Sequence, residues 1–155
     1  MTEDESRRDS AVASLDVPVD PCVVWRALVD RASWWPALEF DAVSGAPLRE
    51  TWTDGDRTLE ATGRVLVVDE PSRLSFEWTE PGWRAPLAVD LTVGPGSGGS
   101  TVTVTESGFT ELDASGFDAS GALRLEHEEG WQEHLQRLHR ACLDLAARSR
   151  PSAGA

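Results

Sequence analysis

The chain has 155 residues, enough for one domain with a sizeable core, and its formal net charge at pH 7 is -13. This acidic balance repels nucleic acid and anionic membrane surfaces, so the sequence predicts neither kind of partner. Residues 1–10 contain no apolar segment, and no run of about 18 apolar residues occurs, so we expect a cytoplasmic protein without a signal peptide or membrane span.

The amino-acid usage is biased. Lys, Tyr, Asn and Ile do not occur, and all 14 basic residues are Arg. Because the four missing types have AT-rich codons, the composition indicates a GC-rich, bacterial genome. Without Lys, the chain has no side-chain amine that could form a Schiff base, and without Tyr it has no phenolic acid. Cys22 and Cys142 lie in helical patterns without metal-ligand or disulfide spacing, and we expect both thiols to be buried.

Both ends of the chain are expected to be flexible tails. Residues 1–10 are acidic and polar, and residues 148–155 contain RSRPSAGA, so neither segment buries enough apolar surface to offset its ordering entropy. Residues 11–147 are expected to form the single domain. Removing the tails should then cost little stability.

The domain begins with a predicted strand and a predicted helix. AVASLDV, residues 11–17, has the pattern of a strand, and Asp20 with Pro21 supplies an N-cap and a first-turn proline for a helix. Residues 32–40 are interrupted by Pro36. They are predicted to form a short helical turn followed by a loop.

Hydrophobic periodicity changes to two between Val43 and Thr105. This alternation predicts an antiparallel sheet covered on one face, with successive strands joined as a meander. VLVV at residues 65–68 is apolar on both faces, which indicates a bulge or a strand covered on both sides. The alternation is clearest in residues 48–52, 74–78, 87–93 and 101–105.

Turn residues separate the predicted strands. Pro71-Ser72 predicts a type I turn, and Pro81-Gly82 predicts a type II turn because glycine accepts the positive φ of its third position. Both turns join neighbouring strands of the expected meander.

A long amphipathic helix is predicted at residues 122–147. Its apolar face must pack on the covered face of the sheet. We therefore expect an α+β fold in which a curved antiparallel sheet wraps around a long carboxy-terminal helix, with two short helices near the amino terminus closing one end. The residues that line this face are Trp131, Leu135, Leu138, Cys142 and Leu145.

Several motifs resemble those of a known family. They occur in the family's order and spacing, and together they span nearly everything from residue 11 to residue 145. The chain resembles the single-domain Hsp90-ATPase-activator-homologue (AHSA1-like) group of the START-like, Bet v 1-like (SRPBCC) superfamily. The motifs are VDPCVVWRAL, SWWP, ATGRVLVVDEPSRLSFEW, STVTVTESGF and HEEGWQEHLQRL.

This resemblance implies a helix-grip fold, in which a bent sheet grips the long helix and leaves a cavity between them. It does not imply one chemistry, because members include ligand carriers, co-chaperone domains and cyclase-like enzymes. The function therefore depends on which residues line the cavity.

Large apolar side chains are the first candidates for a ligand site. A bent sheet and a straight helix diverge, and large rings bridge such a gap while leaving flat apolar walls. Trp131 is thus predicted to wall a cavity, whereas Trp25 is predicted to be ordinary core. The candidate ligand-binding residues are Trp35, Phe40, Trp52, Phe76, Trp78, Trp83, Trp131, Leu135 and Leu138.

Glu50 is the first candidate polar contact. Period-two alternation places it on the same strand face as Leu48 and Trp52. If that face points inward, the buried carboxylate needs a partner such as Arg64 or Arg84, or else a ligand that donates to it.

His127 and His134 are the other candidate polar contacts. They lie on or beside the apolar stripe, where they either form structural hydrogen bonds or contact a ligand and transfer a proton. HEEGW, residues 127–131, nearly spells the zinc motif HExxH, but Trp131 occupies the second histidine position. No metal, cofactor or catalytic residue is predicted.

The sequence supports three functional hypotheses. The first is a protein that binds a small hydrophobic or aromatic ligand between the sheet and the last helix, without being an enzyme. The second is a cyclase-like or hydratase-like enzyme acting in the same cavity. The third is an Hsp90-type co-chaperone or stress-response interaction module. The sequence leaves both a homodimer and a chaperone partner open.

Overall fold

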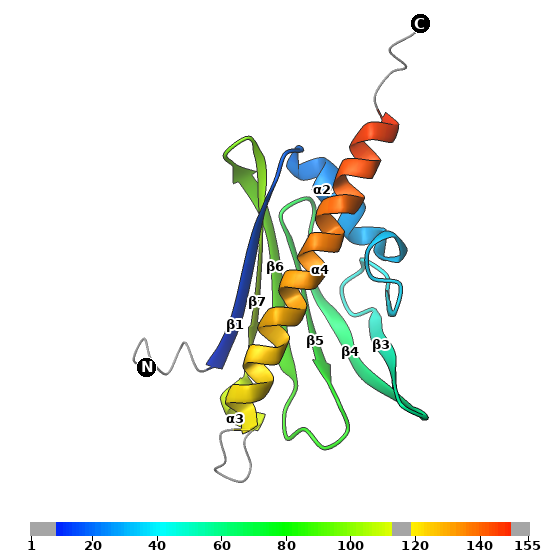
Figure 1. The fold of residues 1–155 in the computed structure, drawn as a ribbon, viewed down its shortest axis with the longest axis vertical. Helices are drawn as coiled ribbons and strands as arrows, with labels where there is room; N and C mark the ends of the chain where they lie inside the picture. The colour runs from blue at the N-terminus through cyan, green and yellow to red at the C-terminus, as the bar shows by residue number, and fades with distance from the viewer. Residues whose placement is uncertain (1–8, 113–118, 150–155) are drawn as a thin grey trace, which may run out of the picture.

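A seven-stranded antiparallel sheet and one long helix form most of the structure (Figure 1), a computed structural model that describes residues 9–112 and 119–149. The strands are β1 (Ser10–Val17), β2 (Leu38–Phe40), β3 (Pro47–Asp54), β4 (Arg57–Asp69), β5 (Arg73–Thr79), β6 (Leu87–Gly96) and β7 (Gly99–Ser107). The helices are α2 (Pro21–Val29), the 3-10 turn η1 (Arg31–Ser33), α3 (Phe109–Leu112) and α4 (Ala119–Ser149). This is the predicted α+β helix-grip architecture.

The sheet has the order β1-β7-β6-β5-β4-β3-β2. Strands β2 to β6 each pair with the next strand along the chain, which confirms the predicted meander, and β1 pairs with β7. The bulge predicted in VLVV is present, because the register of β4 against β5 shifts between Val65 and Val67. The helix α4 crosses one face of this sheet, and α2 lies at one end beside it (Figure 1).

The turn after β5 has the predicted type. The backbone N–H of Trp83 donates to the carbonyl of Glu80 at 3.1 Å, and Gly82 has a φ of 93°. These are the features of a type II turn at Pro81-Gly82.

The turn between β4 and β5 differs from the prediction. The Glu70–Pro71 peptide bond is cis, and the backbone N–H of Ser72 donates to the carbonyl of Asp69 at 2.7 Å. A turn with cis-proline at its third position belongs to type VI. The predicted type I turn is therefore wrong.

The amino-terminal region contains a strand that the sequence did not predict. Helix α2 begins at Pro21 as expected, although the Asp20 side chain makes no capping hydrogen bond. In residues 32–40 the η1 turn leads into β2, where Leu38 and Phe40 are buried against the sheet. The predicted loop is wrong there, since three residues are too few for period-two alternation to reveal a strand.

The apolar stripe of α4 packs into the core as predicted. Trp131, Leu135 and Leu138 are buried, and Leu145 is partly buried against the same cluster. Trp25 of α2 is also buried in it, as expected. The stripe therefore joins the sheet to the amino-terminal helix.

The two cysteines differ in burial. Cys142 is buried, and burial raises the pKa of its thiol to about 11. Cys22 is exposed, so its predicted burial is wrong. It lies on the outward side of α2, whose inward side presents Trp25 and Leu28.

The predicted tails fall largely outside the described residues, which omit 1–8 and 150–155. Strand β1 begins at Ser10, one residue before the expected domain boundary, and α4 continues to Ser149. Among the described residues, no helix combines the length and apolar character needed to cross a membrane.

Candidate functional site

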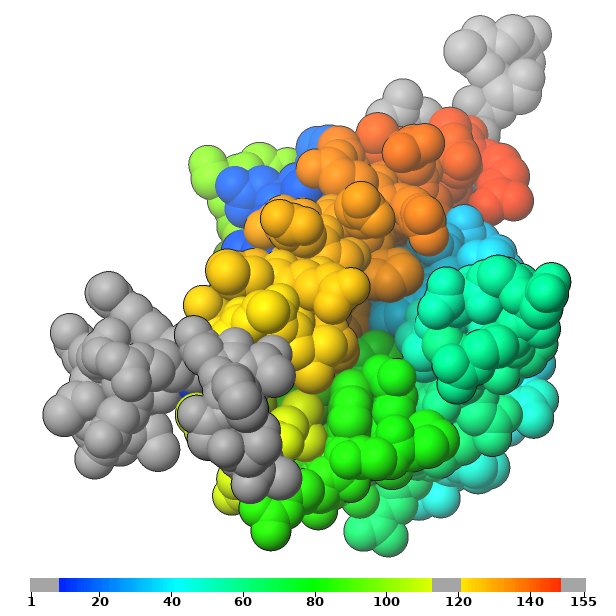
Figure 2. All heavy atoms as spheres, turned by 60° about the horizontal axis from the view of Figure 1, so that its bottom comes forward, coloured from blue at the N-terminus to red at the C-terminus, as the bar shows by residue number. Residues whose placement is uncertain are grey.

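A cavity of about 360 Å³ lies between α4 and the inner face of β3, β4 and β5. The surface is hollowed between α4, the β3–β4 hairpin and the loop after β5 (Figure 2). Its volume falls within the range of roughly 300–1,000 Å³ typical of small-molecule sites. The lining residues are Trp35, Glu50, Trp52, Leu59, Ala61, Trp78, Glu80, Leu123, Glu126, His127, Gly130, Trp131 and His134.

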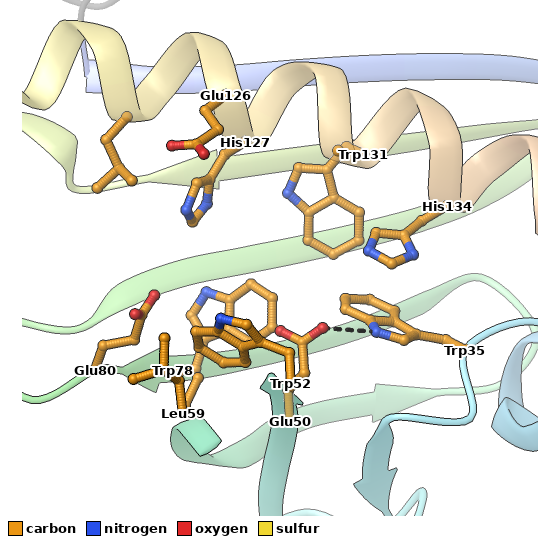
Figure 3. A pocket seen from close by; sticks show the side chains of 13 residues that line it. Trp35, Glu50, Trp52, Leu59, Trp78, Glu80, Glu126, His127, Trp131 and His134 are labelled. Carbon is orange, nitrogen blue, oxygen red and sulfur yellow. Dashed lines mark hydrogen bonds between the residues drawn. The ribbon is translucent and has the colours of Figure 1, made fainter. Parts of the chain in front are cut away.

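Four tryptophans line the cavity. The rings of Trp35, Trp78 and Trp131 pack on one another, with centroid distances of 5.3, 5.9 and 6.1 Å. Trp52 comes from β3, on the sheet side of the cavity, and is partly exposed (Figure 3). Because edge-to-face pairs stabilise one another beyond simple burial, three of the four rings hold a fixed position.

Glu50 points into the cavity from β3 (Figure 3). Its Oε2 accepts a hydrogen bond from Trp35 Nε1 at 2.9 Å. Burial raises the pKa of Glu50, and this hydrogen bond offsets part of the rise. The predicted arginine partners are wrong: Arg64 Nε donates to Glu77 Oε1 at 3.0 Å on the outer face, and Arg84 is exposed.

A second carboxylate, that of Glu106, lies fully buried beside the aromatic wall at the end of β7. Its Oε1 accepts from Trp131 Nε1 at 2.9 Å and bonds His127 Nδ1 at 2.7 Å. Its Oε2 accepts from Trp78 Nε1 at 2.6 Å. These three hydrogen bonds offset the cost of burying the charge. They also hold the rings of Trp78 and Trp131 and the imidazole of His127 to a single carboxylate.

His127 is oriented by this buried carboxylate. Burial lowers the pKa of His127, but the hydrogen bond and attraction to Glu106, with smaller effects of Glu80 and Glu126, outweigh it and raise the pKa overall. Because Nδ1 bonds Glu106, Nε2 is the ring nitrogen left for a ligand. An imidazole held this way has the geometry used to transfer protons.

His134 is held differently. Its ring stacks on Trp35 at a centroid distance of 3.8 Å, and burial lowers its pKa to about 4. Its Nδ1 is buried and has no hydrogen-bond partner in the described part of the chain. The side chain is therefore neutral at pH 7.

Glu80 and Glu126 lie at one end of the cavity, on opposite sides of it (Figure 3). Glu80 is partly buried, and burial raises its pKa. Glu126 is exposed on α4. This end of the cavity therefore combines carboxylates with the imidazole of His127.

The cavity brings together many residues that the sequence singled out. They come from the loop between η1 and β2, from β3 and β5, and from α4, so no single segment forms the site. The residues that line it are Trp35, Glu50, Trp52, Trp78, His127, Trp131 and His134.

The other candidates lie outside the lining. Phe76, Leu135 and Leu138 are buried core residues, and Phe40 is buried in β2. Trp83 lies on the loop after β5, where its ring centroid is 6.1 Å from that of His127.

Glu106 is the principal residue that the sequence reasoning missed. Val102 and Val104 share one face of the predicted strand at residues 101–105, and Glu106 continues the same alternation by one further step. A carboxylate in phase with buried valines was therefore the available signal. Leu59, Ala61, Glu80, Leu123, Glu126 and Gly130 were also not singled out.

The near-match to a zinc motif gives no ligand set in this structure. His127 Nδ1 is engaged by Glu106, and Trp131 occupies the position of a second histidine. No group of three His, Cys, Asp or Glu side chains within residues 9–112 and 119–149 is arranged to hold a metal ion.

Residues 18–142 match the family described as activator of Hsp90 ATPase homolog 1-like protein. The chain belongs to this family. The match covers most of the AHSA1-like chain, including every strand from β2 to β7 and α4 as far as Cys142. Comparison with curated proteins gives no match.

Solved structures identify the fold as Bet v 1-like. Protein MLL2253 from Mesorhizobium loti is 20% identical with a TM-score of 0.67, and the alignment covers 92% of this chain and 99% of that chain. Ara h 8.0201 is 15% identical with a TM-score of 0.66, covering 87% and 97%. DynU16, a protein in the dynemicin biosynthetic locus, is 26% identical with a TM-score of 0.68, covering 85% and 46%. The AHSA1-like chain thus spans about half the length of DynU16.

Proposed function

We propose that this AHSA1-like chain binds a small hydrophobic or aromatic molecule in the cavity between the sheet and α4. The observation that carries this proposal is the cavity of about 360 Å³ walled by four tryptophans, three of which fix one another in place. A preformed apolar wall with a few polar groups is the usual construction of a small-molecule site.

Filling the cavity tests the proposal. Ala61 is buried on β4 and lines the cavity, so Ala61→Leu adds bulk to the space without removing a polar contact. Ala88 is exposed on β6, and Ala88→Leu is the matched control. We expect Nile red, an uncharged dye that fluoresces in apolar surroundings, to bind several-fold more weakly to Ala61→Leu and equally to Ala88→Leu.

Equal binding of Nile red to wild type and Ala61→Leu would contradict the proposal. Native mass spectrometry of the purified protein is the complementary measurement, because a co-purifying small molecule would give the mass of the ligand. Its loss in Ala61→Leu would assign it to this cavity.

A second candidate function is proton transfer to or from a molecule held in the cavity. The pair of His127 and Glu106 favours it, since a buried carboxylate orients the imidazole while Glu50 lies elsewhere in the lining with a raised pKa. The membership of DynU16 in a biosynthetic locus agrees with such a role. Under this hypothesis, His127→Gln abolishes turnover of the identified ligand but retains its binding; unchanged turnover would contradict it.

A further inference from the structure

The polar groups of the cavity are mainly hydrogen-bond acceptors. Three carboxylates line it, whereas no arginine does within the described residues, and the chain has no lysine. The indole N–H groups of Trp35, Trp78 and Trp131 are already donated to Glu50 and Glu106. These three rings, which are almost fully buried, therefore give the lining apolar surface but no free donor.

The carboxylates of the lining are incompletely satisfied. Glu50 Oε1 and both carboxylate oxygens of Glu80 and Glu126 receive no hydrogen bond from any residue that the structure describes. Burial raises the pKa of both Glu50 and Glu80, because little in the site compensates their charge. A partly buried carboxylate of this kind gains most from a cationic or strongly donating neighbour.

The histidines do not provide that cation. His127 bonds Glu106, so its protonated form makes a neutral pair with that carboxylate. His134 is neutral at pH 7, since burial lowers its pKa to about 4. The remaining charge of the lining is therefore negative.

The aromatic walls favour the same kind of ligand. The faces of tryptophan rings attract ammonium groups through the ring quadrupole, and the attraction increases when water is excluded. Trp52 follows Glu50 by two residues on β3 and lies beside it in the cavity (Figure 3). Trp35 turns its N–H edge to Glu50 and stacks one face on His134. An ammonium group at this point would therefore meet the Glu50 carboxylate and the ring of Trp52.

We propose that the ligand of this cavity is an organic ammonium compound, a protonated amine carried on an aromatic or apolar body. This inference rests on the proposed ligand-binding function and specifies the ligand's charge. A ligand carrying a carboxylate or phosphate would meet charges of its own sign. An uncharged hydrocarbon would bury Glu50 without supplying a partner.

Three probes with the same two-ring body separate these cases. They are 2-naphthylmethylamine, which is a cation, 2-naphthylmethanol, which is neutral, and 2-naphthoate, which is an anion. Titration calorimetry at about pH 8 keeps most of the amine protonated and lies well above the ordinary glutamate pKa of about 4.3. We expect the amine to bind at least about tenfold more tightly than the alcohol, and the carboxylate to bind most weakly.

Charge-neutralising variants assign the preference to the cavity. Glu50→Gln and Glu80→Gln should each reduce affinity for the amine by about three- to tenfold while changing affinity for the alcohol little. Glu60→Gln is the matched control: Glu60 lies on β4 between the lining residues Leu59 and Ala61, but is exposed. It removes the same charge from a protein of net charge -13 without touching the cavity.

Each result decides the inference. Equal affinities of the amine and the alcohol would overturn it but leave the ligand-binding function intact. An amine preference that Glu60→Gln reduces as much as Glu50→Gln would also overturn it, because the cause would then be the overall charge. Binding of Nile red with no naphthyl probe bound would overturn the cation inference alone, whereas failure of Nile red and all three probes would overturn the proposed function as well.

Discussion

At the scale of single residues, Glu106 connects the cavity to the core. It is fully buried, yet it contacts a histidine and two tryptophans that line the cavity. Hydrogen bonds to a buried charged group stabilise a fold more than neutral ones do. The same carboxylate therefore contributes to stability and to the placement of His127.

Replacing this carboxylate tests both roles. Glu106→Gln keeps the shape but removes the charge, and its amide cannot accept from all three donors. We expect a loss of about 2 to 3 kcal/mol in the free energy of unfolding, measured by chemical denaturation. The pKa of His127, followed by NMR, should fall because burial then dominates.

The control for Glu106→Gln is Glu77→Gln. Glu77 pairs with Arg64 on the outer face of the sheet, where Arg64 is largely exposed, so its loss should cost at most about 1 kcal/mol. A pKa of His127 that is the same in Glu106→Gln and wild type would show that the buried carboxylate does not control the imidazole.

His134 makes stability depend on pH. Its folded pKa is about 4, below the ordinary value of 6.5, so between these values the unfolded chain binds a proton that the folded chain does not. Stability is therefore lost as the pH falls from about 6.5 to about 4, by up to about 3 kcal/mol. Glu50 and Glu80 act in the opposite sense, since their raised pKa values favour the folded state on acidification.

Comparison of wild type with His134→Gln isolates this effect. Glutamine stays neutral across the whole range, so the variant should lose less stability than wild type between pH 7 and about pH 4.5. Denaturant titrations at several pH values give the two slopes. Parallel slopes would mean that His134 is protonated in the folded state and not buried as a neutral ring.

At the scale of elements, the sequence predicted the helices and strands that are long enough to show a regular hydrophobic repeat. The meander and the long helix follow from repeats of two and 3.6, and VLVV, where the repeat of two breaks, holds one of its two predicted alternatives, a bulge. The sequence could not reveal β2, which is too short to show a period, or the cis bond before Pro71. Strand β2 is defined by its pairing with β3, which no local pattern announces.

Gly63 shows how closely two strands of the site approach. A Cβ atom added there would lie 1.7 Å from the carbonyl oxygen of Glu77 on β5. Gly63→Ala must therefore push β4 away from β5, which carries Trp78 and leads to Glu80. We expect a loss of at least about 2 kcal/mol in the free energy of unfolding and weaker Nile red binding.

Gly94→Ala is the matched substitution. Gly94 also lies within a strand, β6, but a Cβ there would meet no atom within 4 Å, and neither glycine has a positive φ. It should leave stability unchanged or raise it by about 0.4 to 1 kcal/mol, because alanine restricts the unfolded chain. If the two substitutions change the free energy of unfolding equally, the close approach of β4 to β5 at Gly63 does not require a glycine.

At the scale of the whole molecule, the site depends on contacts between distant segments. Trp35 and Glu50 share one cavity with Trp131 and His127 because α4 crosses the face of the sheet to which Glu50 points. The sequence could mark these side chains as apolar or inward-facing, but it could not show which of them share one cavity. Phe76 and Leu138 have the same pattern and lie in the core instead.

Hydrogen bonds also join Asp9, the residue before β1, to the segment that follows β7. Asp9 Oδ1 accepts from the Thr110 hydroxyl at 2.6 Å and from its backbone N–H at 3.2 Å, and the Asp9 carbonyl accepts from the Gly108 N–H at 3.1 Å. Ser10 pairs with Ser107 in the sheet. The expected boundary at residue 11 therefore cuts through contacts that hold β1 and α3 together.

Two truncated chains test where the domain begins. A chain trimmed to residues 9–149 should melt within a few degrees of the full chain, because the removed segments have few large apolar residues. A chain trimmed to residues 11–149 also loses the contacts of Asp9 and Ser10, at a cost of about 1 to 2 kcal/mol, which corresponds to a Tm lower by roughly 3 to 8 °C. Asp9→Ala in the full chain should reproduce part of this drop in calorimetry, because it removes the carboxylate that caps Thr110 and leaves the backbone in place. If both truncated chains melt at the same temperature, Asp9 contributes nothing measurable and the domain begins at residue 11, where the composition alone had placed it.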